Sequence, residues 1–512
     1  SNNNNINNCS SSSSIKGHDD ELDGGPLGSC LVRSMKCMLR VDDPMEARGV
    51  WIDQLGRGIV YKSFMLIGPA LLDSANKSAG CDVISDEEYD DCRISGGIKP
   101  SSVLTIIAVI AGTISTICMP IFGAMMDYTP HRWKMGALTA AILVLCKGLE
   151  IMISPSTWLI VAILQVISSI TFVFHMCTAL PYVYELSKVP SQQTRYNVSI
   201  AISFFLGAFL LSVCTLSIAI PLNTDNVGTA RISQIITTIS AAFLFGYSWA
   251  YLLPHRPAYS QVPPGTNLLK CGFLKLSDTC RRLQSDLSTL KWFYLSVAFN
   301  AAGANGIATI GTTFMHDHLG MTGNEIGGLF FIAILTSFPG TKLAEYVTYK
   351  SDPFMSSILC YLYFISVNFS AAFFLRGPED KSSMYIIGFF WGIAFGWMEP
   401  MNDLIIMTII PHNQASEMMG MFIFCHQVIC WLPPLFFTFL NEIGTPINIG
   451  LASVNVFFVI GICFILKMGA YNDVIEITLS STYQRTEEQN HKQLNQDNDN
   501  ENYPTTQITP IT

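Results

Sequence analysis

The stretch PIFGAMMDYTPHRWK at residues 120–134 decides the fold class, because it begins as apolar sequence and ends in a compact group of charges. Gly123 precedes Asp127 by four residues, and Arg132 follows that aspartate by five. An apolar run that stops in this way is typical of a helix that leaves a membrane and meets water.

The composition of the whole chain agrees with a membrane location. Half of the 512 residues are hydrophobic, only 13% are charged, and the mean hydropathy is +0.38. A soluble chain of this length carries about 25% charged residues. A helix that crosses the bilayer needs about 20 mostly apolar residues, and about twelve such runs are present. Their expected bounds are 55–75, 101–126, 135–153, 157–180, 197–220, 231–253, 291–314, 326–345, 354–375, 384–410, 418–440 and 447–468.

The two ends of the chain have a different composition. The head begins SNNNNINNCSSSSS, and the tail contains RTEEQNHKQLNQDNDNEN. Such sequences cannot bury enough apolar surface to offset the entropy lost on ordering, so we expect disorder at residues 1–47 and 469–512. The net charge of −9 is concentrated in these ends and in residues 76–100. It therefore gives no reason to expect a nucleic-acid partner.

The distribution of Lys and Arg predicts the orientation in the membrane. With a cytoplasmic N-terminus, the inside connections contain bases such as Arg132, Lys188 and Arg281. Half of the bases outside then stand in the acid-rich loop at residues 76–100. The positive-inside rule favours this arrangement, with both termini in the cytoplasm.

A linker at residues 254–290, rich in Pro and then basic, divides six expected spans from six. We therefore expect an N-terminal six-helix bundle at 48–253 and a C-terminal six-helix bundle at 291–468. The predicted fold class is an all-α integral membrane protein of about twelve transmembrane helices with disordered termini.

A second stretch, SFPGTKLAEYVTYKSDP at residues 337–353, ends the eighth expected span as residues 120–134 end the second. Gly340 and Glu345 correspond to Gly123 and Asp127. Glycine lets helices approach closely, and a carboxylate can face the positive N-terminal end of a neighbouring helix. These four residues and Arg132 predict a gate that breaks and re-forms when the halves rock. The alternative is an ordinary helix stop at the membrane surface.

The first copy resembles the signature loop of the major facilitator superfamily, whose twelve helices form two bundles around a mid-membrane substrate site. Within that superfamily the chain resembles the vacuole effluxer family, whose members are like autophagy-related protein 22. The stretches that carry the resemblance are EARGVWIDQLGRG (46–58), PIFGAMMDYTPHRWK (120–134), ALPYVYEL (179–186), FNAAGANGIATIG (299–311) and IIPHNQASEMMGMF (409–422).

The resemblance implies export of amino acids from an acidic vacuolar or lysosome-like lumen to the cytosol, where amino acids recycled by autophagy are needed. It also implies that residues of this chain that match the family's motifs have functional roles. The matching residues are Asp53, Gly123, Asp127, Arg132, Pro181, Asn305, Gly306, Pro411, Glu417 and Gly420.

Ionisable residues within a span are costly and usually face the bundle interior or water. The tenth expected span contains WMEPMNDLI, in which Glu399 and Asp403 share one helical face and Asn402 is adjacent. Two carboxylates this close resist joint ionisation, so the pair is a candidate for binding a substrate ammonium or carrying a coupled proton. The alternative is a structural pair neutralised by Lys147 or another base.

Other polar residues in spans give weaker candidates for the substrate and proton sites. Lys147 and Glu150 in the third span either contribute to a site or neutralise each other, with the lysine snorkelling to the surface. His175 in the fourth span suits a proton sensor or simply bonds a helix carbonyl. Asn300 and Asn305 in the seventh span offer amides to a zwitterion or bridge helices.

Cysteine spacing gives no metal signal among the fifteen cysteines, and we expect no metal, cofactor or enzymatic activity. Cys81 and Cys92 stand together in the acidic outside loop, where an oxidising compartment would join them. Asn76 begins a glycosylation sequon on the same side. Both features fit a lumenal face reached through the secretory pathway. With them, the resemblance to the vacuole effluxer family implies a vacuolar or other endomembrane rather than the plasma membrane.

The sequence therefore predicts a secondary transporter that works by alternating access, moving neutral amino acids with protons as a monomer in the lipid bilayer. Substrate is expected to bind between the halves near Glu399, Asp403 and Lys147. Two alternatives stay open. One is a carrier of another small solute such as a sugar, an organic anion or a drug, and the other is a solute sensor that does not transport.

Overall fold

The computed structural model describes residues 43–81, 92–94, 97–186, 190–255, 257–258, 262, 267–285, 288–410 and 415–476. The predictions of disorder at the two ends fall almost wholly outside these residues. The described part is helical throughout, apart from turns, loops and one isolated bridge between Ile94 and Ile98. The all-α fold class is confirmed.

The first half of the chain forms six long helices. They are α2 (Met45–Ala79), α4 (Val103–Tyr128), α5 (Arg132–Leu149), α6 (Trp158–Leu186), α7 (Pro190–Ala219) and α8 (Asn226–Tyr247). Short one-turn segments extend three of them, namely η1 (Pro100–Ser102) before α4, η2 (Glu150–Met152) after α5 and η3 (Ser248–Leu252) after α8. A further helix, α9 (Leu268–Ser285), lies within the expected linker.

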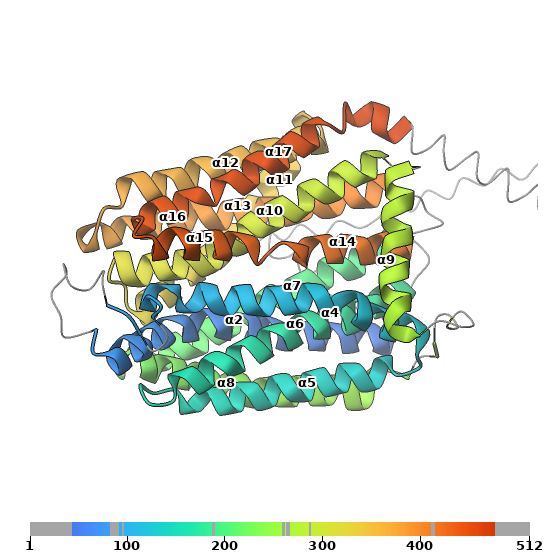
Figure 1. The fold of residues 1–512 in the computed structure, drawn as a ribbon. Coiled ribbons are helices and arrows are strands. Elements are labelled where there is room, and N and C mark those ends of the chain that lie inside the picture. The colour runs from blue at the N-terminus through green and yellow to red at the C-terminus, as the bar shows by residue number, and fades with distance from the viewer. Residues whose placement is uncertain are drawn as a thin grey trace, which may run out of the picture.

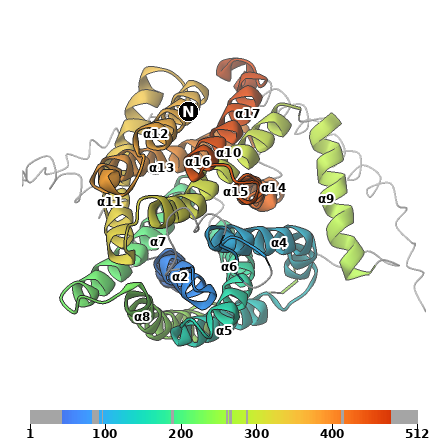
Figure 2. The ribbon, with the colours of Figure 1, turned by 60° about the vertical axis from the view of Figure 1, so that its left-hand side comes forward.

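The second half consists of the helices α10 (Ser288–Thr313), α11 (Gly323–Lys350), α12 (Pro353–Phe374), α13 (Lys381–Ile409), α14 (Ala415–Val428), α15 (Leu432–Glu442), α16 (Ile447–Ser453) and α17 (Asn455–Leu466). Two short segments, η4 (Phe314–His318) and η5 (Pro378–Asp380), precede α11 and α13. In Figures 1 and 2 these helices pack beside those of the first half, and α9 runs across one end of the assembly.

Ten of the twelve expected spans are helices or helix pairs that are long and apolar enough to cross a membrane. The other two are α10 and α13, with 26 and 29 residues. At about 1.5 Å per residue each exceeds the roughly 30 Å of a bilayer core. All twelve expected spans therefore coincide with helices of the structure.

Local sequence explains several helix ends. Asp225 caps α8 by accepting a hydrogen bond from the backbone of Gly228, and Asp352 caps α12, whose first residue is proline. Thr322 and Glu325 form a reciprocal capping box at the start of α11. Polar residues in the connections thus start the helices at the membrane surface.

The structure refines several of the expected bounds. The span expected at 418–440 corresponds to the candidate membrane span Met418–Glu442, which consists of α14 and α15. The two helices are separate because Pro433 and Pro434 have no N–H to continue the ladder of hydrogen bonds. The first span was expected at residue 55, but α2 already begins at Met45. Counting apolar runs does not find this part of α2, because the segment contains polar residues. In the folded protein their side chains pair with residues of neighbouring helices.

The two ends of the molecule differ in how the halves meet. At the end that carries the Cys81–Cys92 disulfide, here called the disulfide end, α15 bonds to the start of α4. Glu442 accepts hydrogen bonds from Arg93, from the backbone of Lys99 and from Ser102. The opposite end, here called the α9 end, carries α9 and Asp127. The described hydrogen bonds between the halves therefore concentrate toward the disulfide end.

A second group of contacts closes the disulfide end between α8, α2 and α11. Asn226 bonds Asp73 of its own half and accepts from the backbone of Gly323. Thr229 donates to Asn324 at 2.9 Å. His316 of η4 bonds Asp73 across the halves at 2.8 Å. Together with the Glu442 group, these contacts hold the two bundles against each other at this end.

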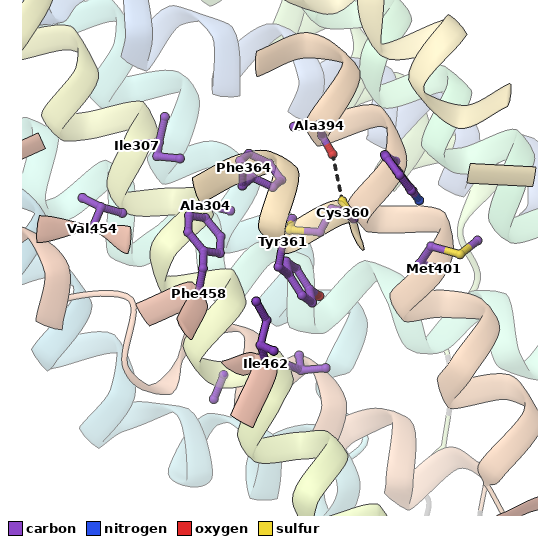
Figure 3. Close-up of a cluster of buried hydrophobic side chains, with 14 of the residues drawn as sticks. Ala304, Ile307, Cys360, Tyr361, Phe364, Ala394, Met401, Val454, Phe458 and Ile462 are labelled. Atoms are coloured by element: carbon purple, nitrogen blue, oxygen red, sulfur yellow. Dashed lines mark hydrogen bonds between the residues drawn. The ribbon is translucent and has the colours of Figure 1, made fainter. Parts of the chain in front are cut away.

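The second half has a large aromatic core. Phe364 of α12 stacks on Phe458 of α17 with ring centroids 5.0 Å apart, and Tyr361 lies beside Phe458 (Figure 3). Cys360 donates a weak hydrogen bond to the carbonyl of Ala394 on α13. This packing fixes α12, α13 and α17 as one body and sets the direction in which α13 presents its polar residues.

Candidate substrate site

Glu399 and Asp403 of α13 are exposed side chains, although Met398, Met401 and Asn402 around them are buried. Close packing of α11 on α13 occurs one or two turns earlier, where the backbone of Ser337 leaves no room for a Cβ at Gly396. Further along α13, Met401 still contacts α11 through a hydrogen bond from Thr348. Helical spacing places them on one face, and their charges interact.

Both halves contribute residues near the acids. Glu399 is close enough to Tyr61 of α2 for its charge to act on the phenol, and Asp403 is similarly close to His426 of α14. Tyr61 packs on Phe204, with ring centroids 5.3 Å apart. The acids therefore lie where the two halves face each other, and they remain accessible.

Asn402 does not join this acidic pair. Its amide oxygen accepts a hydrogen bond from Tyr361 of α12 at 2.9 Å, and only 1% of the residue is exposed. Asn300 also interacts with Tyr361 and donates to Ser296. These two asparagines are part of the interior of the second half, and the expected grouping of Asn402 with the acids is wrong.

Asn305 is the predicted amide that stays exposed. It lies on α10, where its amide donates to the carbonyl of Ala301 and to the Cys430 sulfur at 3.4 Å, beside the break between α14 and α15. Gly306 packs against Pro433 at the same break, where a Cβ would come within 2.9 Å. The position of Asn305 therefore stays compatible with a solute contact.

Lys147 and Glu150 pair with each other inside the first half. The Lys147 ammonium donates to Glu150 at 2.9 Å and lies 3.7 Å from the ring centroid of Phe64. Gln165 and Ser168 of α6 also donate to Glu150, and both members of the pair are fully buried. Every described contact of Lys147 is within the first half, so the expectation that it reaches the acids of α13 is wrong, and so is snorkelling.

His175 is not a lone histidine. Its Nε2 lies 3.0 Å from Asp53 of α2, and its Nδ1 lies 2.9 Å from the hydroxyl of Thr139 on α5. Trp249 of η3 donates to the same Asp53 oxygen at 2.7 Å. This fully buried network connects four elements of the first half, and it holds α2 in position.

The loop after α4 pairs differently from the expected gate. Asp127 accepts a hydrogen bond from Lys275 of α9 at 2.5 Å, while the Arg132 guanidinium lies over the ring of Tyr182 at 5.8 Å. Among the described residues, nothing lies within 4 Å of a Cβ built on Gly123, so none of them makes the close helix approach expected there. That approach occurs instead at Gly272 of α9, which packs on the backbone of Pro120.

The second copy of the loop pairs within its own helix. Lys342 donates to Glu345 at 2.5 Å, and 71% of the Glu345 side chain is exposed. Gly340 does pack closely, against the backbone of Ile393 on α13. The two copies therefore share a sequence pattern but not a set of contacts.

The remaining predicted positions are spread over several elements. Asn76 is half-buried in the last turn of α2, immediately before the disulfide. Pro411 lies outside the described residues, as do the side chains of Pro181 and Glu417, and Gly420 has open space around it. Within the described ranges, no three His, Cys, Asp or Glu residues gather as a metal site would require.

Two buried cations of α2 were missed. Arg57 lies over Phe172, with its guanidinium carbon 4.8 Å from the ring centroid, and Lys62 lies 4.6 Å from the centroid of Phe330 on α11. Each is at most 4% exposed. Both are charged residues inside an expected apolar span, and that signal alone marks them as candidates.

Comparison with known proteins agrees with this architecture. Residues 56–434 match the family model described as Major Facilitator Superfamily. This protein belongs to the major facilitator superfamily, and it is thus a membrane transporter of the alternating-access type that moves a small solute. A comparison with curated protein sequences finds no relative that matches.

Solved structures with the same fold include carriers of very different solutes. The human organic anion transporter MFSD10 has a TM-score of 0.57 at 13% identity, covering 82% of this chain and 99% of its own. The inward-open xylose transporter XylE from E. coli gives 0.55 at 14%, covering 83% and 98%. The nucleoside transporter NupG gives 0.54 at 12%, covering 83% and 99%. At these identities the similarity shows the fold alone.

Proposed function

We propose that this transporter exports neutral amino acids from a vacuolar or lysosome-like lumen to the cytosol, with protons as the coupling ion. The observation that carries the proposal is the exposed pair of Glu399 and Asp403 at the meeting of the two halves. A carboxylate pair can bind the ammonium of an amino acid or hold a transported proton. His426 beside Asp403 offers a second proton carrier.

The proposed orientation places the disulfide end in the lumen and the α9 end in the cytosol. Disulfides persist in oxidising compartments, and this end carries the Cys81–Cys92 disulfide. The contacts of Glu442 and Asn226 then close the lumenal side. In this orientation the structure corresponds to the inward-facing half of the transport cycle. A glycosidase-sensitive mass shift that disappears in Asn76→Gln would support a lumenal disulfide end.

The direct test is counterflow of labelled leucine and tyrosine in proteoliposomes with an imposed pH gradient. We expect uptake to follow the gradient in the wild type and to fall by about tenfold or more in Glu399→Gln or Asp403→Asn, because each variant loses a charge-assisted contact. Glu379→Gln, on the exposed surface of η5, is the matched control and should transport normally.

Two other results would change the assignment. If uptake persists without a pH gradient and does not depend on the direction of the gradient, proton coupling is contradicted but amino-acid transport is supported. A folded wild type that moves neither amino acid would remove this cargo, and a sugar, organic anion or drug carrier or a non-transporting sensor would take its place. The vacuolar location is tested separately by imaging the tagged protein against a vacuolar membrane marker.

A further inference from the structure

Arg57 of α2 is a buried cation that lacks an ion pair in the described part of the chain. Its Nη1 donates to Gln54 at 2.9 Å, and its Nε is buried without a hydrogen-bond partner there. Only 4% of the residue is exposed. A guanidinium has five N–H donors, and burying one without an anionic acceptor is costly.

The nearest described acid does not meet that need. Asp53 lies one helical turn before Arg57 and acts on it through its charge. Asp53 accepts from His175 and Trp249 through Oδ1, and its buried Oδ2 has no hydrogen-bond partner in the described structure. No ion pair between Asp53 and Arg57 forms. Aromatic rings of α6 and α7 flank the guanidinium, with Phe172 and Phe204 at 4.8 and 5.9 Å from its carbon. Aromatic contact holds the group in place but supplies no acceptor.

The position of Arg57 relates it to the acidic pair. Tyr61 follows Arg57 by one helical turn, packs on the same two aromatic rings, and interacts with Glu399 across the halves. Residues four apart on a helix have Cβ atoms about 6 Å apart. The first half therefore presents an unsatisfied cation one turn from the place where the second half presents accessible carboxylates.

We propose that Arg57 binds the carboxylate of the transported solute while Glu399 or Asp403 binds its ammonium. The substrate class is then a small zwitterion with a free carboxylate, held between the two halves. This rests on the proposed function and adds to it a specific ligand and a chemical requirement. A solute that touches both halves binds each conformation with a different affinity, as alternating access needs.

A purely structural role for Arg57 makes a different prediction. As a cation–π clamp between α2, α6 and α7, it would affect every solute equally through the stability of the first half. As a carboxylate ligand, it would affect only solutes that carry a carboxylate. The two roles therefore separate in a ligand series that varies one group at a time.

The experiment is equilibrium binding of leucine, leucine amide, isopentylamine and 4-methylpentanoate to the purified full chain. We expect the wild type to bind leucine about tenfold or more tighter than leucine amide, because the amide loses a charge-assisted bidentate contact. In Arg57→Gln, leucine affinity should fall to the level of the amide, while isopentylamine binding stays unchanged. Arg57→Lys should give an intermediate preference, since it keeps the charge but loses the planar fork.

Three results would be decisive. If Arg57→Gln keeps the preference for leucine over the amide, or weakens all four ligands equally, the inference is wrong while amino-acid transport can still stand. If the wild type transports no amino acid but binds 4-methylpentanoate through Arg57, the proposed function fails and the carboxylate ligand remains. If the wild type binds no carboxylate in the series, the inference is overturned. Thermal unfolding of both variants in detergent shows that they are folded.

Discussion

Asp127 at the end of α4 and Lys275 of α9 form an ion pair of 2.5 Å, and this pair fastens the helix between the two halves to the first half. Gly272 brings the backbone of α9 against Pro120 one turn before the lysine. The loop that resembles the superfamily signature therefore contacts the connection between the halves. Movement of the halves must change the position of α9 relative to α4 or carry α9 along with α4.

Breaking this pair should slow transport with little effect on folding. Asp127 and Lys275 are 31% and 40% exposed, so the pair contributes about 1 kcal/mol or less to stability. We expect Asp127→Asn and Lys275→Gln to lower the counterflow rate several-fold at unchanged melting temperature. Asp278→Asn on the exposed face of α9 is the control. Normal rates in both variants, at wild-type abundance, would show that the pair has no role in transport.

A cross-link that locks the disulfide end should test whether this end opens during transport. The hydroxyls of Thr105 on α4 and Thr438 on α15 lie 2.6 Å apart across the halves. We expect the double variant Thr105→Cys, Thr438→Cys to cross-link on oxidation and to stop transport, because the closed end can no longer open.

Reduction of the cross-linked protein should restore uptake, and the wild type under the same reductant controls for loss of Cys81–Cys92. Full transport by a protein shown by mass spectrometry to be cross-linked would mean that this end does not open in the cycle. The same result would also remove the assignment of the disulfide end as a gate.

His316 should stabilise the protein in its charged form. Burial opposes that charge, but hydrogen bonds to Asp317 and Asp73 outweigh it and raise the pKa of His316 from 6.5 to about 10. Since the folded pKa is the higher one, the stabilisation is complete below pH 6.5 and is lost as the pH rises through about 10. The contact therefore persists at neutral and at mildly acidic pH.

The corresponding measurement is thermal unfolding of His316→Gln across this pH range. We expect the variant to be less stable than the wild type below pH 6.5, by about 1.5–3 kcal/mol, the typical value of a hydrogen bond to a charged group. The difference should shrink above pH 10. His318→Gln, whose ring bonds only a backbone carbonyl in the described structure, should show no such trend. A deficit independent of pH would contradict the charge assignment.

Lys62 should destabilise the closed arrangement in which it is buried. Its ammonium has no hydrogen-bond partner in the described structure, and it makes a cation–π contact with the ring of Phe330 in the other half. Replacing a buried polar group that lacks a partner with an apolar one of similar length removes a desolvation cost of about 1–3 kcal/mol. Lys62→Met should therefore raise the melting temperature in detergent, whereas the exposed Lys342→Met should not. A lower melting temperature would contradict this explanation.

Much of the secondary structure follows from the sequence because the bilayer imposes a simple length and polarity requirement on each helix. The twelve expected spans coincide with helices, and the structure contains the Cys81–Cys92 disulfide. This rule does not identify a helical segment whose polar side chains are buried against partners on other helices. The first ten residues of α2 were missed for this reason, since Asp53 is buried by His175 and Trp249 from other helices.

The candidate site is less predictable, because helical spacing gives a face but not the element that the face meets. Glu399 and Asp403 lie on an exposed face of α13, yet Asn402 turns to Tyr361. Lys147 has the right chemistry to neutralise those acids, but Glu150 is nearer in space and holds it.

The sequence by itself determined the helices, the two halves and the presence of ionisable groups inside the membrane, because these depend on local polarity and chain length. Only the tertiary structure decided which partner each charge has. Asp127 meets Lys275, a residue 148 positions away, and Arg57 is left near Tyr61 without an ion pair to any described residue. Such pairings depend on distances between helices, which the packing of the whole assembly sets and no local pattern encodes.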